Sequence, residues 1–164
     1  MQLNNLKDLY LEQLRDLYSA ESQLISALPE MANAASHSEL KRGFQEHLEQ
    51  TRQHKQRLDE LFSGLGASPS GEDCEAMEGL IKEGQEILQM QGDSSVKDAA
   101  LIAAAQRVEH YEIAAYGTVA TFAEMLGRSE DKMTLGRTLE EEKATDEKLT
   151  KLARQVVNPD ALKS

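Results

Sequence analysis

Apolar residues recur every three or four positions along nearly the whole chain, and this spacing is typical of the buried face of an α-helix. The N-terminal part carries one such stripe, formed by Leu3, Leu6, Tyr10, Leu14, Leu17, Leu24 and Leu28. Pro29 follows directly on this stripe. Because proline removes a backbone donor and crowds the preceding turn, we expect a kink or a helix boundary there.

The same spacing predicts four further helices. A second long helix begins near Ser38 and turns inward Leu40, Phe44, Leu48, Leu58 and Leu61. Gly64–Gly71 is rich in glycine and serine, which indicates a loop. The remaining predicted helices are a short one over 72–89, a long alanine-rich one over 96–126, and a last one over 130–157 that stops before Asn158-Pro159.

No part of the chain shows the alternating, β-branched pattern of a strand, so we predict an all-α fold. Two antiparallel hairpins of long helices, joined by a connection that carries the short helix, would form a four-helix bundle. Such a connection can cross the length of the bundle, which gives the up-down-down-up order of ferritin-like folds. A weak internal repeat, His47–Leu58 against Thr138–Leu149, supports two equivalent halves. We expect a single domain over residues 1–164.

Charge and composition narrow the possible functions. The chain has 18 Lys and Arg against 29 Asp and Glu, a net charge of −11, which disfavours nucleic acid and anionic membranes as partners. The N-terminus lacks the regions of a signal peptide, and no stretch reaches the roughly 18 consecutive apolar residues of a membrane span. The single cysteine, Cys74, cannot form an internal disulfide. These features favour a cytoplasmic protein.

Carboxylates occupy positions on the apolar helix faces. Glu21 lies four residues after Leu17 and three before Leu24, so it points with the leucines. On the alanine-rich helix, Glu109 and Glu112 form an i,i+3 pair that can converge on one point. A lone buried carboxylate costs several kcal/mol unless it is paired, protonated or bound to a cation.

The last helix carries a second acidic pair. Glu142 and Asp146 are spaced i,i+4 and continue its apolar stripe, whereas Glu140, Glu141 and Glu147 face elsewhere and are expected to be exposed. For any one of these helices taken alone, a glutamate at the helix edge with its head in water, or a solvated acidic face, remains a valid interpretation.

Histidines on the second helix complete the pattern. His47 points inward with Phe44 and Leu48. A lone inward histidine is more often a satisfied core residue than a ligand, but His47 lies opposite inward acids on three other helices, which favours a ligand. For His54, which lies near it, we expect no role in the site.

Each long helix thus places ligand-capable groups near its middle. Five ionised carboxylates would repel one another strongly in a dry core, and two divalent cations would neutralise four to five of their charges. Oxygen-rich ligation with one or two histidines favours iron or manganese over structural zinc. The predicted metal ligands are Glu21, His47, Glu109, Glu112, Glu142 and Asp146.

Several strings closely resemble the YciF/YciE family of bacterial ferritin-like proteins. They are YSAESQLISALP (18–29), HLEQT (47–51), CEAMEGLIKE (74–83), DAALIAAAQRVEHYEIAAYGT (98–118) and TLEEEKATDEKL (138–149). The resemblance implies a homodimer, a dinuclear metal centre in the bundle core and an association with bacterial stress response. The same six ligands fall in its motifs. The family's second-helix motif usually reads HLEET, and this chain has Gln50 where the second glutamate stands, which would remove an anion if that residue is a ligand.

Two classes of function remain open. The first is a di-iron or iron–manganese carboxylate protein that reacts with O₂ or peroxide, and is then an oxidase- or peroxidase-type oxidoreductase. The second is a non-enzymatic, stress-related dimeric helical protein whose metal is structural or buffering. Ferritin-like storage would need a hollow shell of many subunits, which nothing in the sequence indicates.

Overall fold

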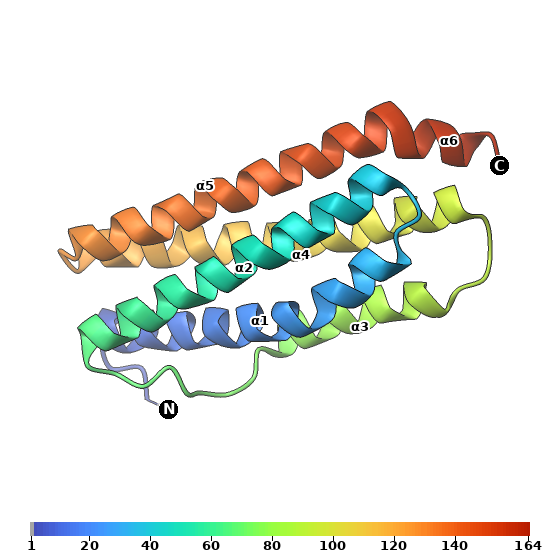
Figure 1. The fold of residues 1–164 in the computed structure, drawn as a ribbon. Coiled ribbons are helices and arrows are strands. Elements are labelled where there is room, and N and C mark those ends of the chain that lie inside the picture. The colour runs from blue at the N-terminus through green and yellow to red at the C-terminus, as the bar shows by residue number, and fades with distance from the viewer. Residues whose placement is uncertain (1) are drawn as a thin grey trace.

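Helices make up nearly all of the computed structural model, which describes residues 2–164. The elements in chain order are α1 (Leu6–Ala34), α2 (Ser38–Leu65), α3 (Glu75–Gln89), α4 (Ser94–Met125), α5 (Ser129–Leu152), a π-helical turn η1 (Ala153–Val157) and α6 (Asn158–Leu162) (Figure 1). Within the described residues no helix is both long and apolar enough to cross a membrane.

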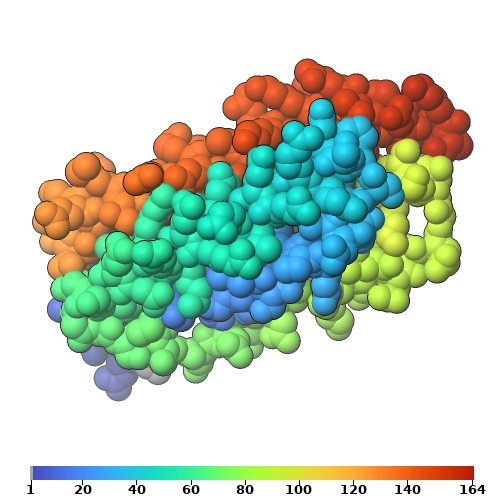
Figure 2. All heavy atoms as spheres, in the orientation of Figure 1, coloured from blue at the N-terminus to red at the C-terminus, as the bar shows by residue number. Residues whose placement is uncertain are grey.

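The four long helices form the expected bundle. α1 packs antiparallel to α2, and α4 packs antiparallel to α5, while α2 and α4 run in the same direction (Figure 1). This is the predicted up-down-down-up order of a ferritin-like fold. The connection between the hairpins carries α3, which packs against α1 and α4. Figure 2 shows the resulting elongated body, with α2 and α5 on the near face.

The structure defines the helix ends near the two prolines. Of the kink and the helix boundary expected at Pro29, the boundary is excluded, since α1 continues through Pro29 to Ala34. Leu28 and Ala32, both buried, keep the turns before and after the proline on the core. The last helix does not stop at Asn158, since η1 leads directly into α6. Pro159 is the second residue of α6, and the backbone N–H of Asn158 before it donates to the carbonyl of Ala153, so the helical path is kept.

The apolar core is divided into two clusters. One contains Leu28, Phe44 and Leu101, and the other contains Tyr10, Leu17, Phe62 and Leu135, among others. Apart from Asp98 and Asp131 near the ends of the bundle, the buried polar residues of the long helices lie between the two clusters. The bundle is therefore apolar towards both ends and polar in a layer near its middle.

Candidate metal centre

Six side chains form the polar layer, and none is more than 3% exposed: Glu21, His47, His54, Glu109, Glu112 and Glu142. Glu21 comes from α1, the histidines from α2, Glu109 and Glu112 from α4, and Glu142 from α5. All four long helices therefore contribute to one buried site.

Helix periodicity explains why these side chains meet. Glu109 and Glu112 are one turn apart on α4, and His47 and His54 are two turns apart on α2, so each pair lies on one face of its helix. Buried Thr51 lies between the two histidines on that face. Each histidine therefore points into the bundle at a different level.

The first group of donors surrounds His47. Its Nε2 lies 3.0 Å from Oε1 of Glu109 and 3.7 Å from Oε2 of Glu142. One ligand atom each from His47, Glu109, Glu112 and Glu142 lie within 4.8 Å of one another. This is the spacing of atoms that share one cation.

The second group surrounds His54. Its Nδ1 lies 2.8 Å from Oε1 of Glu142 and 3.6 Å from Oε1 of Glu21, and these three residues form a second set of donors. Glu142 belongs to both groups, because its two oxygens face different histidines. A carboxylate placed in this way can bridge two cations.

The donor atoms of the layer are not satisfied by one another. Within residues 2–164, the buried side-chain nitrogen and oxygen atoms that lack a hydrogen-bond partner all belong to these six residues, and they number nine. Even the 2.8 Å contact between His54 Nδ1 and Glu142 Oε1 lacks hydrogen-bond geometry. Buried polar atoms are rarely left without partners, so this concentration marks the layer as a group of side chains that could hold a metal ion.

Burial and the nearby carboxylates shift the pKa values of several side chains in the layer when no metal is bound. Burial, followed by repulsion from Glu142, raises the pKa of both Glu109 and Glu112 well above the usual range. Burial opposes a charge on His54, but the carboxylates of Glu142 and Glu21 outweigh it and raise the pKa of the imidazole to about 10. Without metal, protons therefore take the place of cations, and metal binding must release them.

Outer contacts orient two of the donors. Nε2 of His54 lies 2.9 Å from Oε2 of Glu141, and the Tyr116 hydroxyl donates to Oε1 of Glu21. Glu141 was expected to be exposed, but its side chain is only 27% exposed, because Arg57 of α2 draws it against the bundle. Contacts of this kind fix the orientation of metal-binding side chains.

Two sequence expectations differ from this geometry. Asp146 is not brought into either donor group, because its carboxylate accepts from Gln106 and contacts His110. His54, expected to have no role, lies inside the second group. Gln50 lies outside the layer, half-buried, with its Oε1 accepting from Thr145.

The other five predicted ligands, Glu21, His47, Glu109, Glu112 and Glu142, do come together. The signal that identifies His54 is its seven-residue spacing from His47, which places both on one helix face.

Comparisons with known proteins agree with this fold. A family model described as a domain of unknown function (DUF892) matches residues 5–162. Protein YciF of Escherichia coli (strain K12) is 48% identical over 162 residues, which are 98% of each chain. The crystal structure of the E. coli stress protein YciF has a TM-score of 0.92 at 47% identity and covers 95% of this chain and 99% of its own. A ferritin-like, diiron-carboxylate protein of Bacillus anthracis has a TM-score of 0.70 at 19% identity, covers 92% of this chain and 99% of its own, and shares the fold.

Proposed function

The chain belongs to the DUF892 family, as its resemblance to the YciF group predicted, and we propose that it is a dinuclear-metal carboxylate protein that reacts with O₂ or peroxide. The observation that carries this proposal is the layer of nine buried, unpartnered donor atoms supplied by four helices. Such a layer is stable only when protons or cations neutralise it.

The donor set suits two divalent ions. His47, Glu109 and Glu112 would hold one ion, Glu21 and His54 would hold the other, and Glu142 would bridge them. Four ionised glutamates carry four negative charges, and two divalent ions carry four positive ones, so the loaded layer would be neutral. This balance supports a pair of ions rather than one.

The chemistry of the donors supports iron, with manganese as the next choice. Carboxylate oxygens and imidazole nitrogens suit iron and manganese, whereas structural zinc sites favour cysteine and histidine. Among proteins of the same fold, the Bacillus anthracis protein is named as diiron-carboxylate. The name of E. coli YciF as a stress protein supports a role for this chain in a bacterial stress response.

Two ferrous ions would supply two electrons, enough to reduce O₂ and two protons to hydrogen peroxide, or hydrogen peroxide and two protons to two waters. The chain itself supports such chemistry in three ways. The apolar clusters on either side of the layer limit its contact with bulk water. The Tyr116 hydroxyl holds Glu21 in place, and Glu141 holds His54 in place.

Metal analysis of protein prepared without chelator tests this proposal first. We expect two ions per chain, and we expect anaerobic Fe(II)-loaded protein to develop ferric absorption when O₂ or hydrogen peroxide is added. Glu142→Gln should prevent two metal ions from binding side by side and should abolish oxidation of the bound iron, because the Glu142 carboxylate belongs to both donor groups. Glu140→Gln, an exposed neighbour on α5, is the matched control.

Two results would contradict the proposal. Absence of bound metal after incubation with Fe(II) or Mn(II) would exclude the centre altogether. Two bound ferrous ions that neither oxidant changes would instead indicate a structural or buffering site.

A further inference from the structure

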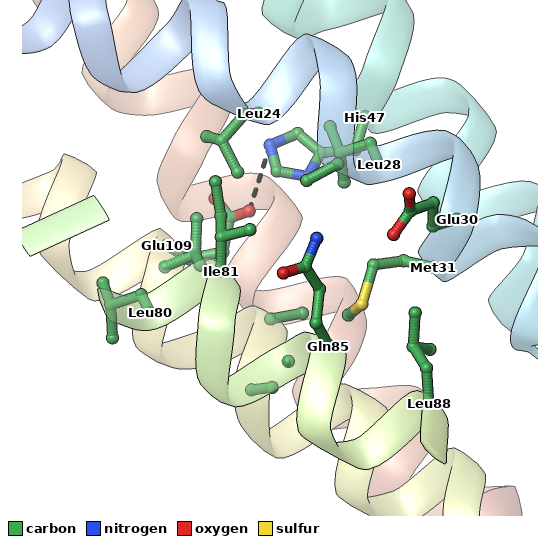
Figure 3. Close-up of a pocket in the computed structure, with 15 residues that line it drawn as sticks. Leu24, Leu28, Glu30, Met31, His47, Leu80, Ile81, Gln85, Leu88 and Glu109 are labelled. Carbon is green, nitrogen blue, oxygen red and sulfur yellow. Dashed lines mark ion pairs between the residues drawn. The ribbon is translucent and has the colours of Figure 1, made fainter. Parts of the chain in front are cut away.

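A small cavity beneath α3 ends at two residues of the donor layer. It lies between α1, α3 and α4, and we call it the α3 cavity. Its inner end is formed by His47 and Glu109, which are joined by their ion pair in Figure 3. The same view shows Gln85 of α3 between Ile81 of the same helix and Met31 of α1.

Four polar residues line the α3 cavity. His47 and Glu109 belong to the donor layer, and Glu30 and Gln85 are exposed residues. Every other lining residue is alanine, glycine, valine, leucine, isoleucine or methionine. The lining of the α3 cavity is therefore mostly apolar.

The size of the α3 cavity restricts what it can hold. It offers about 30 Å³ to the centre of a water-sized sphere, and about 10 to 15 Å³ is enough for one water molecule. Small residues keep this space open, because Gly84 faces Met31 from α3 and Ala104 and Ala105 line it from α4. One diatomic molecule fits, whereas an organic substrate does not.

A second opening reaches His47 between α2 and α5, and its walls differ. Arg42, Glu46 and Lys148 line it together with apolar side chains. Charged walls suit water, ions and hydrogen peroxide, which lose hydrogen bonds on entering an apolar passage. The two openings thus offer different environments to polar and apolar molecules.

We propose that the α3 cavity is the binding and access site for O₂, and that hydrogen peroxide reaches the donor layer by the α2–α5 opening. Cavities with mostly apolar walls can take up apolar guests such as xenon. O₂ is likewise apolar and forms only weak hydrogen bonds, so it loses little on leaving water. The assignment of O₂ as the guest rests on the proposed reaction of the metal centre.

Gly84 provides a variant that narrows the cavity without weakening the helix. A Cβ at this position would lie 3.7 Å from the sulfur of Met31, an ordinary contact that spans the space between α3 and α1. Alanine also favours a helix interior over glycine. Gly79→Ala is the matched control, because Gly79 is on the same helix, is exposed, and has open space around its would-be Cβ.

Xenon binding to the metal-free protein, observed in pressurised crystals, is the first measurement. We expect a xenon atom in the α3 cavity of the natural chain and of Gly79→Ala, and none in Gly84→Ala or the bulkier Gly84→Val. Oxidation of the Fe(II)-loaded protein is the second. Gly84→Ala should raise the KM for O₂ while kcat and the rate with hydrogen peroxide stay unchanged.

The outcomes separate this inference from the proposed function. Natural protein that neither oxidant oxidises overturns the proposed function and the role of O₂ with it. Natural protein that is oxidised by O₂ with the same KM as Gly84→Ala and Gly84→Val overturns only the inference. A rise in KM that is equal for O₂ and hydrogen peroxide also overturns it, because both oxidants would then share one route.

Discussion

The guanidinium of Arg57 binds both oxygens of the Glu141 carboxylate, with Nη1 2.6 Å from Oε2 and Nη2 3.0 Å from Oε1. This bidentate pair joins α2 to α5 beside the donor layer. The same carboxylate contacts Nε2 of His54, so Arg57 positions a proposed metal ligand without touching the metal site. Its guanidinium lowers the pKa of Glu141, and the His54 contact adds to this effect.

We expect Glu141→Gln to weaken metal binding by about 10- to 100-fold, the usual effect of removing a partner of a metal-binding histidine. The amide cannot hold Arg57 with two charged oxygens and no longer favours a proton on Nε2. Competition with a chelator of known affinity measures the change. The control Glu49→Gln removes an exposed ion pair on α2 and should leave the metal affinity unchanged. An equal loss of affinity in both variants would show a general effect of charge.

Substitutions of His54 and Asp146 test which of these two residues is a metal ligand, because the sequence pattern favours Asp146 and the structure favours His54. His54→Ala should lose one of the two ions, because it removes a donor of the second group. Asp146→Asn should keep both, because that carboxylate is engaged by Gln106 and His110 outside the groups. Metal content per chain decides the matter, and loss of an ion from Asp146→Asn would restore Asp146 as a ligand.

The metal-free protein should become less stable as pH rises. The raised pKa values of Glu109 and Glu112 mean that the folded chain keeps protons that the unfolded chain releases above about pH 4.5. The His54 contribution is complete below about pH 6.5 and is lost as pH rises towards its folded pKa of about 10. For each such proton, the free energy of unfolding falls by about 1.4 kcal/mol per pH unit over the range in which only the folded state holds the proton.

Urea unfolding between about pH 5 and pH 9 with chelator present tests this pH dependence. Glu109→Gln should flatten it, because the amide has no proton to lose. Metal-loaded protein should lack the decline, since the cations replace the protons. A decline of equal slope with and without metal would show that it originates outside the donor layer.

A buried carboxylate outside the donor layer holds a helix connection in place. Asp98 of α4 accepts hydrogen bonds from the backbone N–H groups of Ser36 and His37, at 2.9 Å and 2.8 Å. We expect Asp98→Ala to lower the free energy of unfolding by about 1.5 to 3 kcal/mol, the range for a hydrogen bond to a charged group. Chemical denaturation measures the loss. Metal content should not change, and loss of metal would show that the turn also positions His47.

Helical spacing was sufficient to predict the bundle, because the apolar stripes of the long helices are continuous on both sides of their polar residues. The ends of the helices were less predictable. Proline has a local preference against helix interiors, and packing of Leu28 and Ala32 outweighs it at Pro29. Such packing depends on residues far away in the sequence.

The donor layer was predictable where a carboxylate interrupts an apolar stripe, as at Glu21 and Glu112. The position of Asp146 was harder to predict from spacing. Two residues spaced i,i+4 are rotated by about 40° from each other around the helix axis, and this rotation turns Asp146 away from Glu142 and towards Gln106. The internal repeat did not help either. It aligns Glu142 with Thr51, so the matching halves do not carry matching donors.

The division of the donors between the two hairpins links metal exchange to the motion of the whole bundle. α1 and α2 supply Glu21 and both histidines, while α4 and α5 supply the remaining glutamates. Neither hairpin alone has a complete set, so a bound pair of ions would act as a cross-link between segments distant in the chain. Separation of the hairpins would then require release of the ions, and the lifetime of the bound metal would measure how often the bundle opens.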